Sequence, residues 1–364
     1  MANETYGVGD SNAVKIWSKG IWVATREKVD IGPLMGDDED SIIHVKNELS
    51  KNKGDQVKFN LSVVLNGDGF SEGQRAQGNG EAGTMYQDTI LINELGHIYS
   101  PPSEYTIDAQ RVPWDVRDLG RRKLSEWWET RLSVSFFNHV CGYLPANSAP
   151  YGTKYTGLNT VRAHTSGSPT RRLWASTAVS ADESLTSSHP FTLNLIDRAI
   201  TASSIGDLQL RPVMVNGSKK FVCYLHPQQA EDVTTNTSTG QWFSIQQAAI
   251  QGGQITKSPI FNGALGVYKD VVLRKSQHVT LGVNSSTSAS TSNVRRAVFL
   301  GAQAAVCAYS KKGNPAEQKM RWTEKYDDHD RLFEMGAWSV WGLSKAQFNS
   351  VDQGVITLSS YSSQ

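Results

Sequence analysis

The chain has 364 residues, 38% hydrophobic and 20% charged residues, and a formal net charge of +1. This length suffices for about two domains with cores of their own. The near-zero charge argues against a protein that holds nucleic acid through a strongly basic surface. No stretch approaches the length of about 18 apolar residues that a membrane-spanning helix needs, so we expect no membrane partner.

The cysteines are isolated from one another along the chain. Cys141, Cys223 and Cys307 form no CxxC pair, which argues against a zinc site or a redox dithiol. An odd cysteine count is unusual for a secreted disulfide scaffold. The first 17 residues contain no apolar segment of the length found in signal peptides. We therefore expect a chain made in a reducing cytoplasm, which it leaves by cell lysis if at all.

A long glycine-rich segment follows the first clear strand pattern. Residues 1–30 are predicted to be an extended arm with a short helix, and residues 41–50 a short strand or a helical turn. Apolar residues then alternate with mostly polar ones over 57–65, which predicts a strand. Residues 66–85 contain six glycines and almost no apolar side chains, and the strand-like residues 89–92 follow. Structureless loops of this length are uncommon in compact domains, so we interpret 57–92 as a long hairpin that becomes ordered on another molecule.

A long helix is predicted from Pro113 to Cys141, because apolar residues recur there mostly at steps of three or four. Pro113 suits a first helical turn, and Gly142 suits the position after the last. Gly120 is a weak point within the helix. Such a helix would span roughly 40–45 Å and needs a sheet or a neighbouring molecule to cover its aromatic side chains.

The remaining elements alternate between irregular segments, helices and hairpins. Asn216-Gly217 is a strong turn signal between two apolar runs, and Lys269-Asp270 separates two more. The predicted elements are irregular chain over 145–190, helices at 191–205, 228–233 and 241–251, hairpins at 212–225 and 266–273, a polar loop at 284–293, and strands at the ends of 338–358.

The sequence contains no convincing catalytic or metal-binding constellation. Residues 78–83 match GxGxxG, but the dinucleotide motif needs a preceding strand and a following helix, and neither is predicted here. Asp327, Asp328, His329 and Asp330 are consecutive, so we interpret them as a solvated acidic loop rather than a set of convergent metal ligands. His226 follows a strand and precedes a proline, and a strand-end hydrogen bond is its simplest role. We assign no catalytic, metal or cofactor-binding residue, we expect no cofactor, and we do not expect an enzyme.

Two further features leave alternatives open. Dibasic pairs are scattered along the chain and are interpreted as solvated surface, or as sites of subunit ion pairing or loose phosphate contact; they are Arg121-Arg122, Arg171-Arg172, Lys219-Lys220, Arg295-Arg296 and Lys311-Lys312. The ten tryptophans indicate either ordinary core packing or burial at interfaces.

Six sequence blocks, in their order along the chain, resemble one family. The blocks are GDQVKFNLSVVLNGDG, LSEWWETR, FVCYLHPQQAEDV, IFNGALGVYKDVVL, FLGAQAAVCAYS and GAWSVWGLSKAQFNSVDQGVITLSS. The chain is similar to the major capsid proteins of tailed bacteriophages related to the podophage N-four. The resemblance implies an α+β Hong Kong 97-type capsid fold. The segment 327–330 is not recognised as part of that family's pattern.

The resemblance also implies a division of the chain and a function. The expected parts are an N-terminal arm (1–40), an extended hairpin loop (41–100), a peripheral domain with the spine helix (101–150), an axial domain (151–325) and a return to the peripheral domain (326–364). The implied function is a major capsid protein that self-assembles as pentamers and hexamers into the icosahedral shell around packaged double-stranded DNA.

The implied partners are copies of the chain, scaffolding, portal or decoration proteins, and DNA contacted non-specifically. The implied location is the virion, after assembly in the host cytoplasm. Two alternatives stay open from the sequence: another β-rich phage structural protein, such as a tail or carbohydrate-binding protein, and the shell protein of a cellular nanocompartment.

Overall fold

The computed structural model describes most of the chain in several stretches. These are residues 32–46, 55–63, 65, 67, 69–73, 77–78, 80–107, 115–145, 157–165, 170–205, 209–215, 217–235, 264–310 and 320–362. The predicted arm at 1–30 and the predicted helix at 241–251 lie outside these residues. No helix among the described residues has both the length and the apolar character needed to cross a bilayer.

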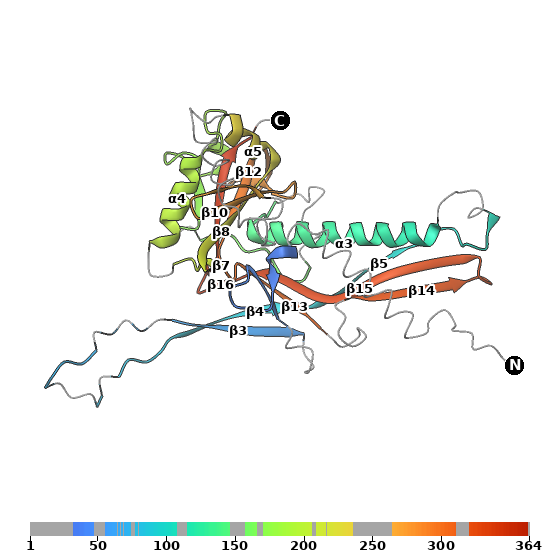
Figure 1. The fold of residues 1–364 in the computed structure, drawn as a ribbon, viewed down its shortest axis with the longest axis horizontal. Coiled ribbons are helices and arrows are strands. Elements are labelled where there is room, and N and C mark those ends of the chain that lie inside the picture. The colour runs from blue at the N-terminus through green and yellow to red at the C-terminus, as the bar shows by residue number, and fades with distance from the viewer. Residues whose placement is uncertain are drawn as a thin grey trace.

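The described chain has three visible parts (Figure 1). A lobe carries the helices α4 (Leu193–Ser204) and α5 (Pro227–Thr235). An elongated body has the long helix α3 (Val116–Val140) lying along a sheet. A hairpin of β3 (Gln56–Ser62) and β4 (Met85–Leu91) projects from the body on the side away from the amino end of α3.

The sheet beneath α3 has six strands in the order β1-β2-β13-β15-β14, and β5 is also paired with β15. Its strands are β1 (Met35–Gly36), β2 (Ile43–Lys46), β5 (Asn93–Tyr99), β13 (Ala305–Tyr309), β14 (Arg321–Asp327) and β15 (Leu332–Lys345). The 14-residue strand β15 organises this sheet: its first half pairs with β14 and its last five residues pair with β13, while β5 spans the middle. One strand therefore links the far end of the body to its centre.

The lobe is built on a second sheet of eight strands in the order β6-β18-β12-β8-β10-β9, with β11 beside β12 and β7 beside β8. Its strands are β6 (Arg172–Trp174), β7 (Val213–Val215), β8 (Ser218–Leu225), β9 (Ala264–Tyr268), β10 (Val271–Lys275), β11 (Leu281–Val283), β12 (Ser290–Leu300) and β18 (Val355–Tyr361). Short elements complete the described fold, namely the 3-10 turns η1 (Gly32–Leu34) and η4 (Asp182–Ser184) and the strands β16 (Gln347–Phe348) and β17 (Val351–Asp352).

Both faces of the eight-stranded sheet are buried, which explains its continuous apolar runs. On β8, Val222 and Tyr224 pack into the same cluster as α3, while Cys223 and Leu225 pack against the side covered by α4 and α5. The two faces alternate because successive strand residues point to opposite sides. The cluster around α3 is continuous across both sheets, so the lobe and the body share a core.

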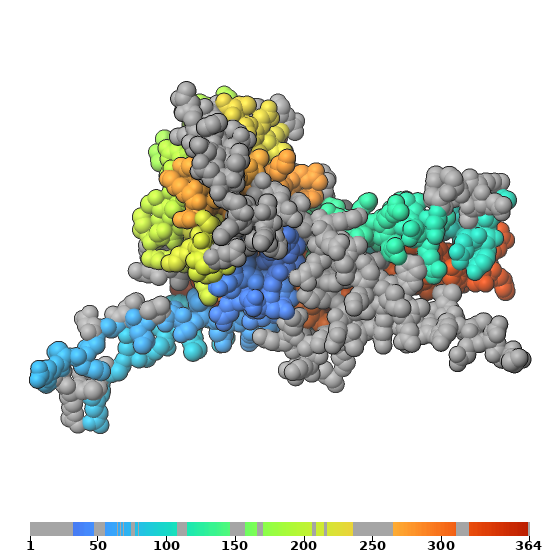
Figure 2. Space-filling view, viewed as in Figure 1, coloured from blue at the N-terminus to red at the C-terminus, as the bar shows by residue number. Residues whose placement is uncertain are grey.

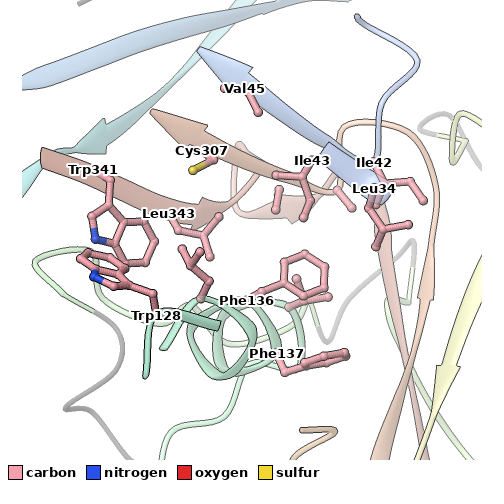
Figure 3. Packing of buried hydrophobic residues seen from close by; sticks show 14 of the residues in the cluster. Leu34, Ile42, Ile43, Val45, Trp128, Phe136, Phe137, Cys307, Trp341 and Leu343 are labelled. Carbon is pink, nitrogen blue, oxygen red and sulfur yellow. The ribbon is translucent and has the colours of Figure 1, made fainter. Parts of the chain in front are cut away.

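The apolar side of α3 is held by the six-stranded sheet (Figure 3). Trp128 packs toward Trp341 of β15, with ring centroids 6.4 Å apart. Phe136 lies beneath the residues of β2, and Phe137 contacts Tyr224 of the second sheet at 5.5 Å between ring centroids. The tryptophans Trp128, Trp322 and Trp341 are therefore core residues of the subunit.

The helix boundaries agree with the predicted end but not with the predicted start. Asp115, in an extended conformation, accepts the backbone N–H of Arg117 at 2.8 Å, so the helix begins at Val116 and not at Pro113. Gly142 has φ of +59°, the left-handed conformation that commonly follows a helix end. Gly120 faces Met335 of β15, and a side chain at this position would collide with it. The predicted weak point is a place of close helix–sheet contact.

Most other predicted elements are confirmed, with two corrections. The helices near 191–205 and 228–233 and the hairpins near 212–225 and 266–273 are present as α4, α5, β7–β8 and β9–β10. The alternatives for 41–50 resolve to a strand, β2. The polar loop predicted for 284–293 is wrong at its end, because Ser290 and Thr291 pair with β11. The irregular stretch 145–190 also contains β6 and η4.

Candidate assembly surfaces and buried ionic clusters

The hairpin β3/β4 is anchored at its base and open at its tip. Its strands pair from Gln56↔Leu91 to Ser62↔Met85. At the base, Val57 and Ile90 pack with Val306 of β13 in a small cluster. This confirms the hairpin predicted from the alternating pattern of 57–65.

Polar contacts fix the base of the hairpin to the body. Arg162 donates to both carboxylate oxygens of Asp88, each at 2.7 Å. Asn159 binds both backbone groups of Leu91, accepting its N–H at 2.9 Å and donating to its carbonyl at 2.8 Å. Bidentate contacts of this kind fix orientation as well as position. The hairpin therefore leaves the body in a defined direction.

The outer part of the hairpin exposes large apolar side chains. Leu65, Phe70 and Met85 are 61%, 52% and 69% exposed. A side chain added at Gly73 or Gly78 would meet nothing within 4 Å, so the chain here lies in open space. Figure 2 shows the hairpin as a thin projection outside the body. Large apolar side chains exposed on a projecting segment are typical of an interaction surface.

A second set of exposed apolar side chains lies at the opposite end of the body. Ile98, Tyr105, Ile107 and Leu332 are exposed there, near the turn between β14 and β15. Tyr105 lies 6.0 Å from Tyr326 between ring centroids, and the Tyr326 hydroxyl donates to Glu104 at 2.9 Å. The subunit thus presents apolar side chains at both ends of its long axis.

The consecutive residues 327–330 lie where β14 leads into β15: Asp327 ends β14, and Asp328, His329 and Asp330 belong to the turn. Asp328, His329 and Asp330 are exposed and have positive φ values. Within the described part of the chain, no group of three metal-ligating side chains is close enough together to hold an ion. These residues are a solvated acidic turn, as predicted. The described residues of 78–83 lie in the open hairpin, with no helix after them.

Two dibasic pairs contribute buried ionic clusters, which the sequence did not reveal. Arg296 Nε lies 2.7 Å from Asp182 Oδ2, and Arg172 Nη2 lies 2.7 Å from Asp182 Oδ1. Burial alone would raise the pKa of Asp182, but the charges of Arg296 and Arg172 lower it to about 2. Arg296 also donates to the carbonyls of Cys141 and Gly142, at 3.2 and 3.0 Å. This arginine ties the carboxyl end of α3 to the lobe.

The second cluster joins the segment 157–165 to the end of β15 and to β17. Lys345 Nζ lies 2.7 Å from Asp352 Oδ1, and His164 Nδ1 lies 3.1 Å from Asp352 Oδ2. Burial would raise the pKa of Asp352, but the hydrogen bond from His164 and the charge of Lys345 lower it to about 2. Burial and the Lys345 charge lower the pKa of His164 to about 4. Arg171 donates to the Asp352 carbonyl at 3.1 Å, so it is also buried rather than solvated.

His226 has the hydrogen-bonding role that its position predicted. Its Nδ1 accepts the backbone N–H of Gln228 at 3.3 Å. The backbone N–H of His226 donates to the side-chain oxygen of Gln229 at 3.1 Å. These bonds close the junction between β8 and α5. The free thiols Cys141, Cys223 and Cys307 are all buried.

A long helix laid along a sheet, a lobe on a second sheet and a projecting hairpin define a Hong Kong 97-like shell protein. Solved phage capsids have this arrangement. The capsid of Ralstonia phage GP4 is similar with a TM-score of 0.79 and 27% identity, covering 100% of this chain and 99% of that one. The cyanophage Pam1 capsid is similar with a TM-score of 0.68 and 16% identity, covering 91% and 92%.

The sequence comparisons give the family. The phage capsid protein family model matches residues 5–364, so the chain belongs to that family. It is 25% identical over 356 residues to the major capsid protein of Pseudomonas phage KPP25, covering 92% of this chain and 90% of that protein. The chain is a major capsid protein of a phage, which confirms the predicted family role, fold and virion location. The grouping with N-four-related phages stays a prediction.

Proposed function

We propose that copies of this chain form pentamers and hexamers that close an icosahedral shell around packaged double-stranded DNA. The family role and the exposed apolar surfaces at both ends of the subunit support this proposal. Scaffolding, portal or decoration proteins are the expected further partners, assembly takes place in the host cytoplasm, and the chain has no catalytic activity. DNA is contacted non-specifically, which fits a net charge of +1.

The β3/β4 hairpin lies across a neighbouring subunit in this proposal. The observation that carries it is the exposure of Leu65, Phe70 and Met85 on a ribbon whose direction is fixed by Asp88 and Arg162. Burying these side chains on a neighbour removes apolar surface from water, worth roughly 25 cal/mol per Å². Many such contacts repeated over a shell allow each to be weak while the assembly is strong.

The described strands support a modified division of the chain. β2 and β5, within the segment 41–100, belong to the six-stranded sheet, so the extended loop proper is 55–92. β18, within 326–364, belongs to the eight-stranded sheet of the lobe. We assign the lobe to the axial domain, and α3 with the six-stranded sheet to the peripheral domain.

Deleting residues 68–82 tests the hairpin contact directly. The base of the hairpin keeps its packing and its polar contacts, so the variant subunit is expected to fold but not to form shells. Circular dichroism and analytical ultracentrifugation measure the two properties separately. The replacement Phe70→Ser is the milder form, and Ile205→Ser, at an equally exposed apolar residue after α4, is the matched control. Shells of normal size from the deletion variant would contradict the proposal.

A further inference from the structure

A cavity of about 360 Å³ lies where the carboxyl-terminal half of α3 meets the lobe. Its polar lining includes Asn138, Tyr143, His226, His278, Thr280 and Arg295. Its apolar lining comes from Val134, Val279 and Leu281. The volume falls within the range of small-molecule sites, which combine an apolar lining with a few convergent polar groups.

Arg295 brings a positive charge to this cavity without a matching carboxylate. Its Nε donates to the side-chain oxygen of Gln228 at 3.2 Å. Among the described residues, no carboxylate lies within ion-pair distance of Arg295, whereas the adjacent Arg296 is paired with Asp182. Burial lowers the pKa of the Arg295 guanidinium, and the opposing influence comes from Tyr143 rather than from an acid. A partly buried cation without a counter-ion favours the entry of an anion.

A second donor, the ring N–H of His226, belongs to the lining of the same cavity. His226 Nδ1 accepts the backbone N–H of Gln228, so the proton of the neutral ring is on Nε2. Burial and the Arg295 charge lower the pKa of His226 to about 4, which keeps the ring neutral near pH 7.

The lining therefore combines one guanidinium and an imidazole N–H, and no Asp or Glu is among its described residues. Such donors bind the oxygens of carboxylates and phosphates. We propose that this cavity is a binding site for a small organic oxyanion, a carboxylate or a phosphate monoester, whose charged group pairs with Arg295 and whose apolar part contacts Val134, Val279 and Leu281. A bound anion would join α3 to the lobe.

Ligand-observed NMR on the purified full chain tests the site with benzoate and phenyl phosphate as probes and benzyl alcohol as the neutral control. We expect saturable binding of at least one anion at millimolar concentrations, and weaker binding of the alcohol. The anion that binds more tightly identifies the preferred charged group. Arg295→Gln is expected to weaken binding about tenfold or more, because hydrogen bonds to charged groups contribute that much. Arg122→Gln, at an exposed arginine of α3, is the matched control and should leave binding unchanged.

His226→Phe provides a second variant, which keeps the charge of Arg295 and removes the imidazole N–H. It is expected to weaken anion binding severalfold without changing the melting temperature of the free protein by more than a few degrees. The proposal is overturned if neither anion shows saturable binding, if the neutral alcohol binds as tightly as the anions, or if both cavity variants bind like the unmodified chain.

Discussion

Lys345 and Asp352 form an ion pair in which neither side chain is exposed, with Nζ 2.7 Å from Oδ1. The lysine also donates to the carbonyl of Arg162 at 3.1 Å, and the aspartate accepts the backbone N–H of Thr165 at 3.1 Å. The pair therefore attaches the segment 157–165 to the end of β15. Arg162 of the same segment binds Asp88, so the pair also supports the base of the hairpin.

Removing one partner of this pair is expected to be costly. Lys345→Met leaves Asp352 buried without its cation, and breaking such a pair typically costs about 3–5 kcal/mol of unfolding free energy. The double variant Lys345→Met with Asp352→Leu should be less destabilised than the single one, because no charge is left uncompensated. Urea unfolding monitored by tryptophan fluorescence measures the unfolding free energies of the single and the double variant. A single variant as stable as the original chain would contradict this account.

Acid is expected to destabilise the subunit in two steps. His164 is charged below about pH 6.5 in the unfolded chain but stays neutral in the folded chain until about pH 4. The unfolded state therefore binds more protons between these values, and stability falls as pH falls, by at most about 1.4 kcal/mol per pH unit. Asp182 and Asp352 have pKa values lowered to about 2. Their contribution to the free energy of unfolding is therefore present above their ordinary pKa and is lost as pH falls toward 2.

The variant His164→Gln separates the two steps. It should flatten the dependence of unfolding free energy on pH between about 6.5 and 4, while the part of the lower step that comes from Asp182 stays in place. His226, half-buried with its pKa also near 4, accounts for the slope that remains. Urea unfolding at a series of pH values tests this, and an unchanged slope in the variant would exclude His164 as the titrating group.

Arg296 is expected to hold the end of α3 to the lobe. Arg296→Met removes its bonds to Asp182 and to the carbonyls of Cys141 and Gly142, and leaves a buried carboxylate with Arg172 as its remaining cation. We expect the free energy of unfolding to fall by about 3 kcal/mol or more. We also expect faster hydrogen exchange at residues 139–143. Arg211→Met removes exposed pairs with Glu39 and Asp40 and should cost under about 1 kcal/mol. Equal effects of the two variants would contradict the assignment.

Gly342 fixes how closely β15 approaches the hairpin. A side chain at Gly342 would collide with the backbone carbonyl of Leu91, at the base of β4. Gly342→Ala is therefore expected to destabilise the subunit by about 1–3 kcal/mol and to expose the hairpin base to proteolysis. Gly80→Ala is the matched control, since a side chain there meets nothing within 4 Å. Limited proteolysis and thermal unfolding compare the two variants.

Local patterns in the sequence predicted the elements but not how distant elements meet. The alternating residues of 57–65 predict β3, and Gly142 marks the end of α3, because both signals are local. The parallel pairing of Ile43 with Ala305 joins residues far apart in the chain, and no local feature indicates it. The polar residues Ser290 and Thr291 resemble a loop and form a strand only because β11 lies beside them.

The buried arginines also show that local sequence does not reveal contacts between distant residues. Arg171-Arg172 and Arg295-Arg296 look like solvated surface in the sequence, because charged residues are mostly exposed. Arg296 is buried because Asp182, 114 positions away, supplies a counter-ion. An arginine pair carries no local sign of whether such a partner exists. Conversely, the glycine-rich composition of 66–85 indicated correctly that this segment leaves the body.

The central claim is that the β3/β4 hairpin is completed by a neighbouring subunit. Cryo-electron microscopy of assembled shells, at a resolution that shows side chains, tests it most directly. The account predicts density for residues 65–85 on the surface of an adjacent subunit, with Phe70 and Met85 covered by it. A shell in which this ribbon contacts its own subunit, or stands in solvent with both side chains uncovered, would contradict the claim.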